Sequence, residues 1–218
     1  MTKYKAVLFD LDGTLADTSL GIINCHRYTL SQMGRPSPSD ELLLKVIGAP
    51  LMETYKNRFG FSPDEAKKAV EIYRERYADK GVCEAFLYEG MASLLRQLLR
   101  NDYRLGVATL KKEEFAVQLL EFLGVADCFD VIKGMDRLDH LTKKDNIIRC
   151  MKEMKLSESQ VVLVGDSPYD AIGAKEAGVS FIGVTYGFGF KTKADIYDEC
   201  AVFAADNSEE LAYYLCSE

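Results

Sequence analysis

Short apolar runs alternate with helical patterns along most of this chain. The four-residue run Ala6–Phe9 ends at the charged Asp10, which predicts a buried strand. Further strands are expected at 104–108, 129–132, 161–164, 181–184 and 201–204. Because helical patterns fall between these runs, we expect an α/β fold with a mostly parallel sheet and crossover helices.

One long stretch of the chain contains helical patterns only, from about residue 17 to residue 85. Its clearest helix start combines Ser62 as N-cap, Pro63 at the first helical position and Glu65 three residues after the cap. We therefore expect an α/β core formed by residues 1–16 and 86–218, with an all-helical domain of residues 17–85 inserted after the first strand.

Composition narrows the classes of partner. The 218 residues carry 27 basic and 34 acidic side chains, a formal net charge of -7, which argues against nucleic acid as a partner. No apolar run approaches the roughly 18 residues of a membrane span. The six cysteines are scattered without a C-x-x-C pair, which is typical of reduced thiols and argues against zinc. We expect a cytoplasmic protein with no membrane partner; the oligomeric state stays open.

The segment Asp10-Leu11-Asp12-Gly13-Thr14-Leu15 carries the strongest chemistry. Two carboxylates two residues apart leave the first strand on the same side, and ligands of open α/β sheets bind beyond the carboxyl ends of the strands. A simple turn is the structural alternative, since Asp and Gly both favour turns. A calcium loop is excluded because an EF-hand needs further oxygen ligands and a closing glutamate.

Other predicted elements also bring polar residues to this edge. Thr109 follows the strand 104–108, Asp166 and Asp170 follow 161–164, and Lys143 and Lys144 open a helix. Each has a structural reading on its own: a strand-end threonine, an N-cap, an acidic residue in a first helical turn, or a solvated lysine pair. Together they indicate one site at the carboxyl edge of the sheet.

These residues together resemble the four ordered motifs of the haloacid dehalogenase-like (HAD) superfamily of phosphotransferases. The hexapeptide at 10–15 is similar to motif I, and Thr109 ends a strand as the motif II residue does. Lys144 falls where the motif III lysine falls, and its spacing to two following isoleucines favours it over Lys143. Gly165-Asp166-Ser167-Pro168-Tyr169-Asp170 is similar to motif IV. The resemblance covers the whole chain, with a Rossmann-like core and the helical insert in the place of a C1 cap.

The resemblance implies a role for each residue. Asp10 would be the nucleophile that forms an aspartyl-phosphate, and Asp12 the general acid and then the base that activates water. Thr109 and Lys144 would hold the phosphoryl oxygens. Leu110 departs from the small or amide residue of many relatives, which puts a second phosphate contact there in doubt.

The resemblance also implies Mg²⁺ as the cofactor. The ion would be bound by the Asp10 carboxylate, the backbone carbonyl of Asp12 and Asp166, and Asp170 would contact it through water or through another ligand. A cation is needed on physical grounds as well, because a phosphate dianion is repelled by several carboxylates.

Within the superfamily, Asp12 argues against dehalogenases, P-type ATPases and phosphonatases, which alter that position. A β-phosphoglucomutase-like phosphotransferase stays an alternative, although the cap loop 47–53 offers no cation for a second phosphate. The second alternative is a non-catalytic HAD-fold binding protein, which would be recognised by the loss of Asp10 or Asp12. The segments 17–23 and 182–189 look like the phosphoglycolate phosphatase and 5′-nucleotidase-like branch. We expect a phosphoric monoester hydrolase acting on a small phosphorylated metabolite.

Overall fold

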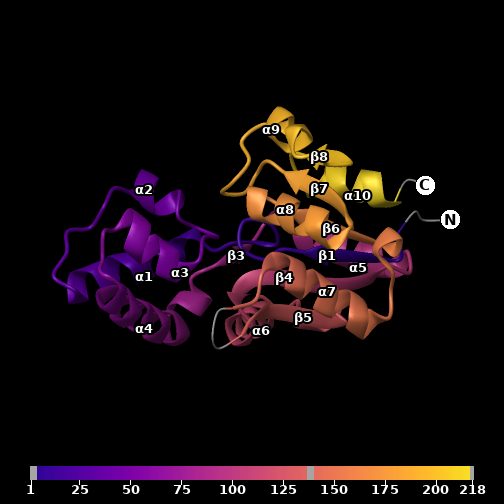
Figure 1. Cartoon of the computed structure of the whole chain (residues 1–218). Helices are drawn as coiled ribbons and strands as arrows, with labels where there is room; N and C mark the ends of the chain where they lie inside the picture. Colours follow the sequence, from indigo (N-terminus) through magenta and orange to yellow (C-terminus); the bar gives the residue numbers. More distant parts are fainter. Residues whose placement is uncertain (1–3, 137–139, 217–218) are drawn as a thin grey trace. The chain divides into compact units, whose positions relative to one another are not determined.

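The computed structural model describes residues 4–136 and 140–216, which form two compact units (Figure 1). The first unit contains the chain up to Asp17 and again from Phe86, and the second unit is Thr18–Ala85.

The first unit is built on a six-stranded sheet in the order β5-β4-β1-β6-β7-β8, with every neighbouring pair parallel. Its strands are β1 (Ala6–Phe9), β4 (Arg104–Lys112), β5 (Val131–Met135), β6 (Val161–Gly165), β7 (Ser180–Val184) and β8 (Phe203–Ala205). The α/β fold with a mostly parallel sheet is thereby confirmed. The third and last of these strands begin two residues later than the sequence predicted, at Val131 and Phe203.

The strand β1 lies at the centre of the sheet, and its four residues are fully buried between β4 and β6. Its last residue, Phe9, pairs with Val107 of β4 and with Val164 of β6. Because all three strands are parallel and in this register, the residues that follow them come to the same edge of the sheet.

Helices cover the sheet (Figure 1). They are α5 (Met91–Arg100), α6 (Glu113–Phe122), α7 (Lys143–Met154), α8 (Pro168–Ala177), α9 (Lys193–Asp198) and α10 (Ser208–Cys216). Buried residues of α7 and α8, among them Ile147 and Ala174, form one apolar cluster with Leu8 and Leu163 of the central strands. This packing fixes the first turns of α7 and α8 at the carboxyl edge of the sheet.

A two-stranded antiparallel sheet that the sequence did not predict joins β2 (Ala16–Asp17) to β3 (Phe86–Leu87). These strands lie where the chain leaves the first unit and where it returns. Two residues per strand are too few to give a periodic pattern of apolar positions, which explains why sequence analysis missed them.

The second unit contains helices: α1 (Ser19–Gln32), α2 (Asp40–Leu44), α3 (Leu51–Glu53), the π-helix η1 (Thr54–Arg58), α4 (Pro63–Asp79) and the 3-10 turn η2 (Gly81–Cys83). The capping box predicted at Ser62 and Glu65 begins α4. The interior of this second unit holds Tyr55, Tyr77 and His26. The imidazole Nδ1 of His26 lies 3.1 Å from the Tyr55 hydroxyl. Burial lowers the pKa of His26 to about 3, so this histidine is a neutral core residue.

Among the described residues, no helix is both long and apolar enough to cross a membrane. The cysteines of these described residues are free thiols, and no disulfide joins any two of them.

Candidate active site

The end of β1 presents Asp10 and Asp12 through a tight turn. The Asp10 N–H donates to the carbonyl of Val164 at 2.9 Å, which continues the sheet by one residue. The chain then turns at Gly13, whose φ is +83°. A Cβ at this residue would lie 2.4 Å from Oδ2 of Asp166, so a glycine is needed for both conformation and space.

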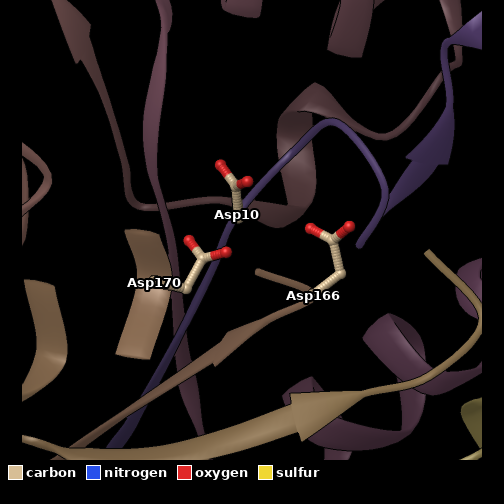
Figure 2. Close-up of side chains that lie close together, drawn as sticks. All are labelled: Asp10, Asp166 and Asp170. Atoms are coloured by element: carbon tan, nitrogen blue, oxygen red, sulfur yellow. The ribbon is translucent and has the colours of Figure 1, made fainter. Parts of the chain in front are cut away.

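Three buried carboxylates meet at this edge. Asp10 follows β1, Asp166 follows β6 and Asp170 lies in the first turn of α8; Figure 2 shows their carboxyl groups gathered around one space. Each offers an oxygen within 4.8 Å of the others. The structure therefore brings together the carboxylates of three of the four aspartates that sequence analysis associated with a metal ion.

Two neighbouring segments hold Asp166 in place. Its Oδ2 accepts hydrogen bonds from the backbone N–H groups of Phe188 (2.7 Å) and Gly189 (3.1 Å). The Thr14 hydroxyl donates to its Oδ1 at 3.4 Å, a long contact. The Thr14 side chain is thus directed at a carboxylate.

Asp170 is fixed from its own helix. Its Oδ2 accepts from the N–H (3.1 Å) and the hydroxyl (2.7 Å) of Ser167, which completes a capping box at the start of α8. The other oxygen, Oδ1, is buried and faces the side chain of Lys143.

Lys143 is the lysine that reaches the carboxylates. Its ammonium lies 2.8 Å from Oδ1 of Asp10 and 2.7 Å from Oδ1 of Asp170, and it donates to the carbonyl of Ala108 at 3.1 Å. Both carboxylate contacts are buried ion pairs. Lys144 is half-buried and acts electrostatically on Asp145. The geometry therefore favours Lys143, against the sequence preference for Lys144.

Thr109 is buried where β4 passes the edge of the sheet. Its hydroxyl oxygen accepts the N–H of Lys111 at 3.2 Å, and its carbonyl accepts from the side-chain amide of Asn146 at 2.8 Å. Arg149 in turn donates to the Asn146 side-chain oxygen at 2.9 Å. Sequence analysis missed Asn146, although it lies three residues after Lys143 and therefore on the same face of α7.

Lys111 is a second residue that sequence analysis missed. Its ammonium donates to both carboxylate oxygens of Asp12, each at 2.8 Å. The two side chains are only 8% and 10% exposed, so the pair is largely shielded from water. Lys111 follows Thr109 by two residues, and this period-two spacing in a strand could have indicated that the two share a side of β4.

Comparison with known proteins gives this arrangement a family. The family model of haloacid dehalogenase-like hydrolases matches residues 7–184. The chain belongs to this family. The resemblance stated from the sequence is thus confirmed, and its motif residues can be compared with HAD relatives.

The named relatives include a 5′-nucleotidase, which is one name of the expected branch, and they also include other activities. A 5′-nucleotidase of Pseudomonas aeruginosa is 34% identical over 188 residues, which covers 86% of this chain and 85% of that protein. The structure of a predicted phosphatase from Clostridium acetobutylicum matches with a TM-score of 0.91 and 33% identity, covering 99% of each chain. A tyrosine-protein kinase, PtkA, of Mycobacterium tuberculosis is 32% identical over 196 residues, 89% of this chain and 66% of that protein. The phosphatases among these relatives agree with the expected enzyme class, a phosphoric monoester hydrolase.

Burial shapes the charge of this HAD site. It raises the pKa of Asp10 to about 6; Lys143 opposes that shift, while Asp170 and Asp12 add to it. Burial, followed by repulsion from Asp170 and Asp10, raises the pKa of Asp166 to about 7 against the two backbone N–H groups that it accepts. Burial alone would lower the pKa of Lys143, but the attraction of its two carboxylates outweighs burial and raises it.

The donor set fits a hard divalent cation. Asp10, Asp12, Asp166 and Asp170 carry four formal negative charges, and Lys111 and Lys143 return two positive ones, so two negative charges stay unbalanced. Lys143 is the cation that faces the buried Oδ1 atoms of Asp10 and Asp170, and its single charge does not balance the three clustered carboxylates. Carboxylate oxygens without nitrogen or sulfur ligands suit Mg²⁺ or Ca²⁺ and disfavour zinc.

Proposed function

We propose that this HAD hydrolase is a Mg²⁺-dependent phosphatase that cleaves small phosphate monoesters through an aspartyl-phosphate on Asp10. One observation carries the proposal: the Asp10 carboxylate ends the central strand within ion-pair distance of Lys143 and beside two further aspartates. A carboxylate so placed can attack phosphorus while neighbouring positive charge offsets the incoming dianion.

We propose that Mg²⁺ is held by the carboxylates of Asp10 and Asp166 and by the backbone carbonyl of Asp12. Asp170 lies close enough to contribute directly or through water. When bound, the ion supplies positive charge that lets carboxylates and a phosphate share the site. Lys143, in place of Lys144, is proposed to neutralise Asp10 and Asp170 and to approach the phosphoryl oxygens. Thr109, whose hydroxyl oxygen already accepts an N–H, can direct its own hydrogen to phosphate.

Asp12 is proposed to move the proton. It gives a proton to the leaving oxygen as the ester P–O bond breaks and the Asp10–phosphorus bond forms. It then takes a proton from the water that attacks phosphorus, which returns Asp10 and releases inorganic phosphate. Ester and water thus give alcohol and phosphate, with both aspartates regenerated.

For the substrate we propose a small phosphorylated metabolite of the phosphoglycolate or nucleotide type. The support is the 5′-nucleotidase relative and the expected branch.

We propose that the helical unit acts as a C1 cap of residues 17–85. We also propose that the protein is cytoplasmic, and the support is the absence of disulfides between the described cysteines. Neither a nucleic acid nor a membrane is a proposed partner.

The test is phosphate release from a panel of monoesters, with Mg²⁺ or with EDTA, by the wild type and by Asp10→Asn. We expect turnover that EDTA removes, and a loss of about 10²-fold or more in Asp10→Asn, because the amide is not a nucleophile. Hydrolysis by Asp10→Asn at the wild-type rate would contradict the proposal. Transfer of phosphate to a sugar phosphate or to tyrosine, without release to water, would instead indicate a mutase or a kinase. Tight phosphate binding without turnover would indicate a binding protein.

A further inference from the structure

Asp12 has a partner that its proposed role must take into account. The Lys111 ammonium contacts both of its carboxylate oxygens at equal distances of 2.8 Å, and both side chains are about nine-tenths buried. Such a contact holds both oxygens at the same distance from one ammonium and restricts rotation of the carboxyl group. Few side-chain orientations of Asp12 are compatible with it.

Lys111 is itself held by the phosphate-binding strand. Its backbone N–H donates to the hydroxyl oxygen of Thr109 at 3.2 Å, at the irregular part of β4 between Ala108 and Lys112. The strand end that carries the proposed phosphate ligand therefore also carries the residue that orients the proposed acid. The two functions are coupled through three consecutive residues.

We propose that Lys111 is the positioning residue of Asp12, and that its ammonium holds the carboxylate in the orientation from which it serves the leaving group. This inference rests on the phosphatase function proposed above. One of the two contacts has to open when that oxygen of Asp12 carries the proton for the leaving group, and the second contact keeps the carboxyl group in place.

The proposal separates Lys111 from a residue that binds substrate only. A general acid matters for a poor leaving group, such as an alkoxide, and matters little for a good one, such as 4-nitrophenolate. Loss of Asp12 positioning must therefore lower kcat on an alkyl ester far more than on an aryl ester. Loss of a phosphate contact would raise KM for both esters alike.

The experiment compares benzyl phosphate with 4-nitrophenyl phosphate in the wild type, Lys111→Met, Lys111→Arg and the neighbouring control Lys112→Met. For Lys111→Met we expect kcat on benzyl phosphate to fall about 10²-fold and kcat on the aryl ester to fall less than about threefold. Lys111→Arg should recover most benzyl phosphate turnover, since a guanidinium also contacts both oxygens of a carboxylate. Lys112→Met should behave as the wild type on both esters.

Thermal unfolding of each variant with and without Mg²⁺ accompanies the kinetics. Equal losses on the two esters in a folded Lys111→Met, or a rise in KM alone, would overturn the positioning role and leave the phosphatase function intact. A Lys111→Arg protein that folds but is as impaired on benzyl phosphate as Lys111→Met would also overturn it. A wild type that hydrolyses neither ester would overturn both proposals.

Discussion

Replacement of Gly173 by alanine should destabilise this protein, although alanine is the better helix former. Gly173 lies inside α8 and is buried. In a helix interior, glycine is less favourable than alanine by roughly 0.5–1 kcal/mol. Helix propensity alone therefore predicts that Gly173→Ala raises the free energy of unfolding.

Packing against Lys143 reverses that sign. A Cβ at residue 173 would lie 2.4 Å from Cγ and 2.7 Å from Cβ of Lys143. Carbon atoms in contact are ordinarily about 3.5–4.0 Å apart. Because the clashing atoms lie at the root of the lysine side chain, α7 and α8 must move apart, and overpacking of this kind costs about 1–3 kcal/mol. Setting the helix-propensity gain against this cost leaves a net loss of up to about 2.5 kcal/mol of stability.

The same displacement should lower activity, because it moves the Lys143 ammonium from Asp10 and Asp170, now 2.8 and 2.7 Å away. A shift of about 1 Å in a catalytic group can cost about 10²-fold in rate. Urea unfolding and kcat/KM on the best ester of the panel measure the two effects. The control is Ile172→Ala on the same helix, which is 50% exposed and should change neither by much. A Gly173→Ala protein that is more stable than the wild type and fully active would refute this reasoning.

Two further predictions concern charge. Lys143→Met should reduce kcat/KM by about 10²-fold or more and Lys144→Met by less than about threefold, because Lys143 is the lysine beside Asp10. Phosphate-release kinetics of the two variants measure this difference. A larger loss in Lys144→Met would favour Lys144, the lysine preferred from the sequence. Burial raises the pKa of Asp10 to about 6 and of Asp166 to about 7, so the folded metal-free protein binds more protons than the unfolded chain between about pH 4 and 7, and its stability should fall as pH rises through that window. Mg²⁺ should raise the unfolding temperature more at about pH 7.5 than at about pH 5.5, and an equal increase at both would contradict this.

The aspartates of the site could be predicted from sequence because parallel strands impose a simple rule. Ala6–Phe9 and Val161–Gly165 are short apolar runs with no competing helical period, and each is followed by a carboxylate. Once both are placed in one parallel sheet, Asp10 and Asp166 must lie at its carboxyl edge. No knowledge of side-chain packing is needed for this step.

The choice between Lys143 and Lys144 depends on which face of α7 is turned toward the sheet, and the sequence pattern did not define that face correctly. Lys144 is followed after three and four residues by isoleucines, which made it look inward-facing. In the structure the buried face of α7 continues through Asn146, Ile147 and Cys150, and this face begins at Lys143. The polar Asn146 concealed the pattern, because it is buried to bond the carbonyl of Thr109 rather than to join the apolar core. A single polar residue with a structural task was enough to shift the assignment by one position.

The pairing of Lys111 with Asp12 could not be predicted, because it depends on which strands are neighbours in the sheet and on where each strand ends. The residues are 99 positions apart in the chain, and they meet because β4 and β1 are neighbours and β4 extends past the end of β1. The sequence predicted that β4 ends at residue 108, whereas it continues to Lys112. An error of four residues in a strand end was sufficient to hide a site residue.

The site also shows why folding and function make opposite demands here. Buried like charges lower stability, and Asp10, Asp166 and Asp170 are held within 4.8 Å of one another. Apolar strands and close-packed helices supply the stability that offsets this cost, and glycines at 13, 165, 173 and 187 leave the space that the charged side chains occupy. A bound cation would offset this repulsion only after the fold has formed, since its proposed ligands follow β1 and β6 and lie in α8. Any ion bound here would therefore require a folded α/β core, and its binding would offset the repulsion among the three aspartates.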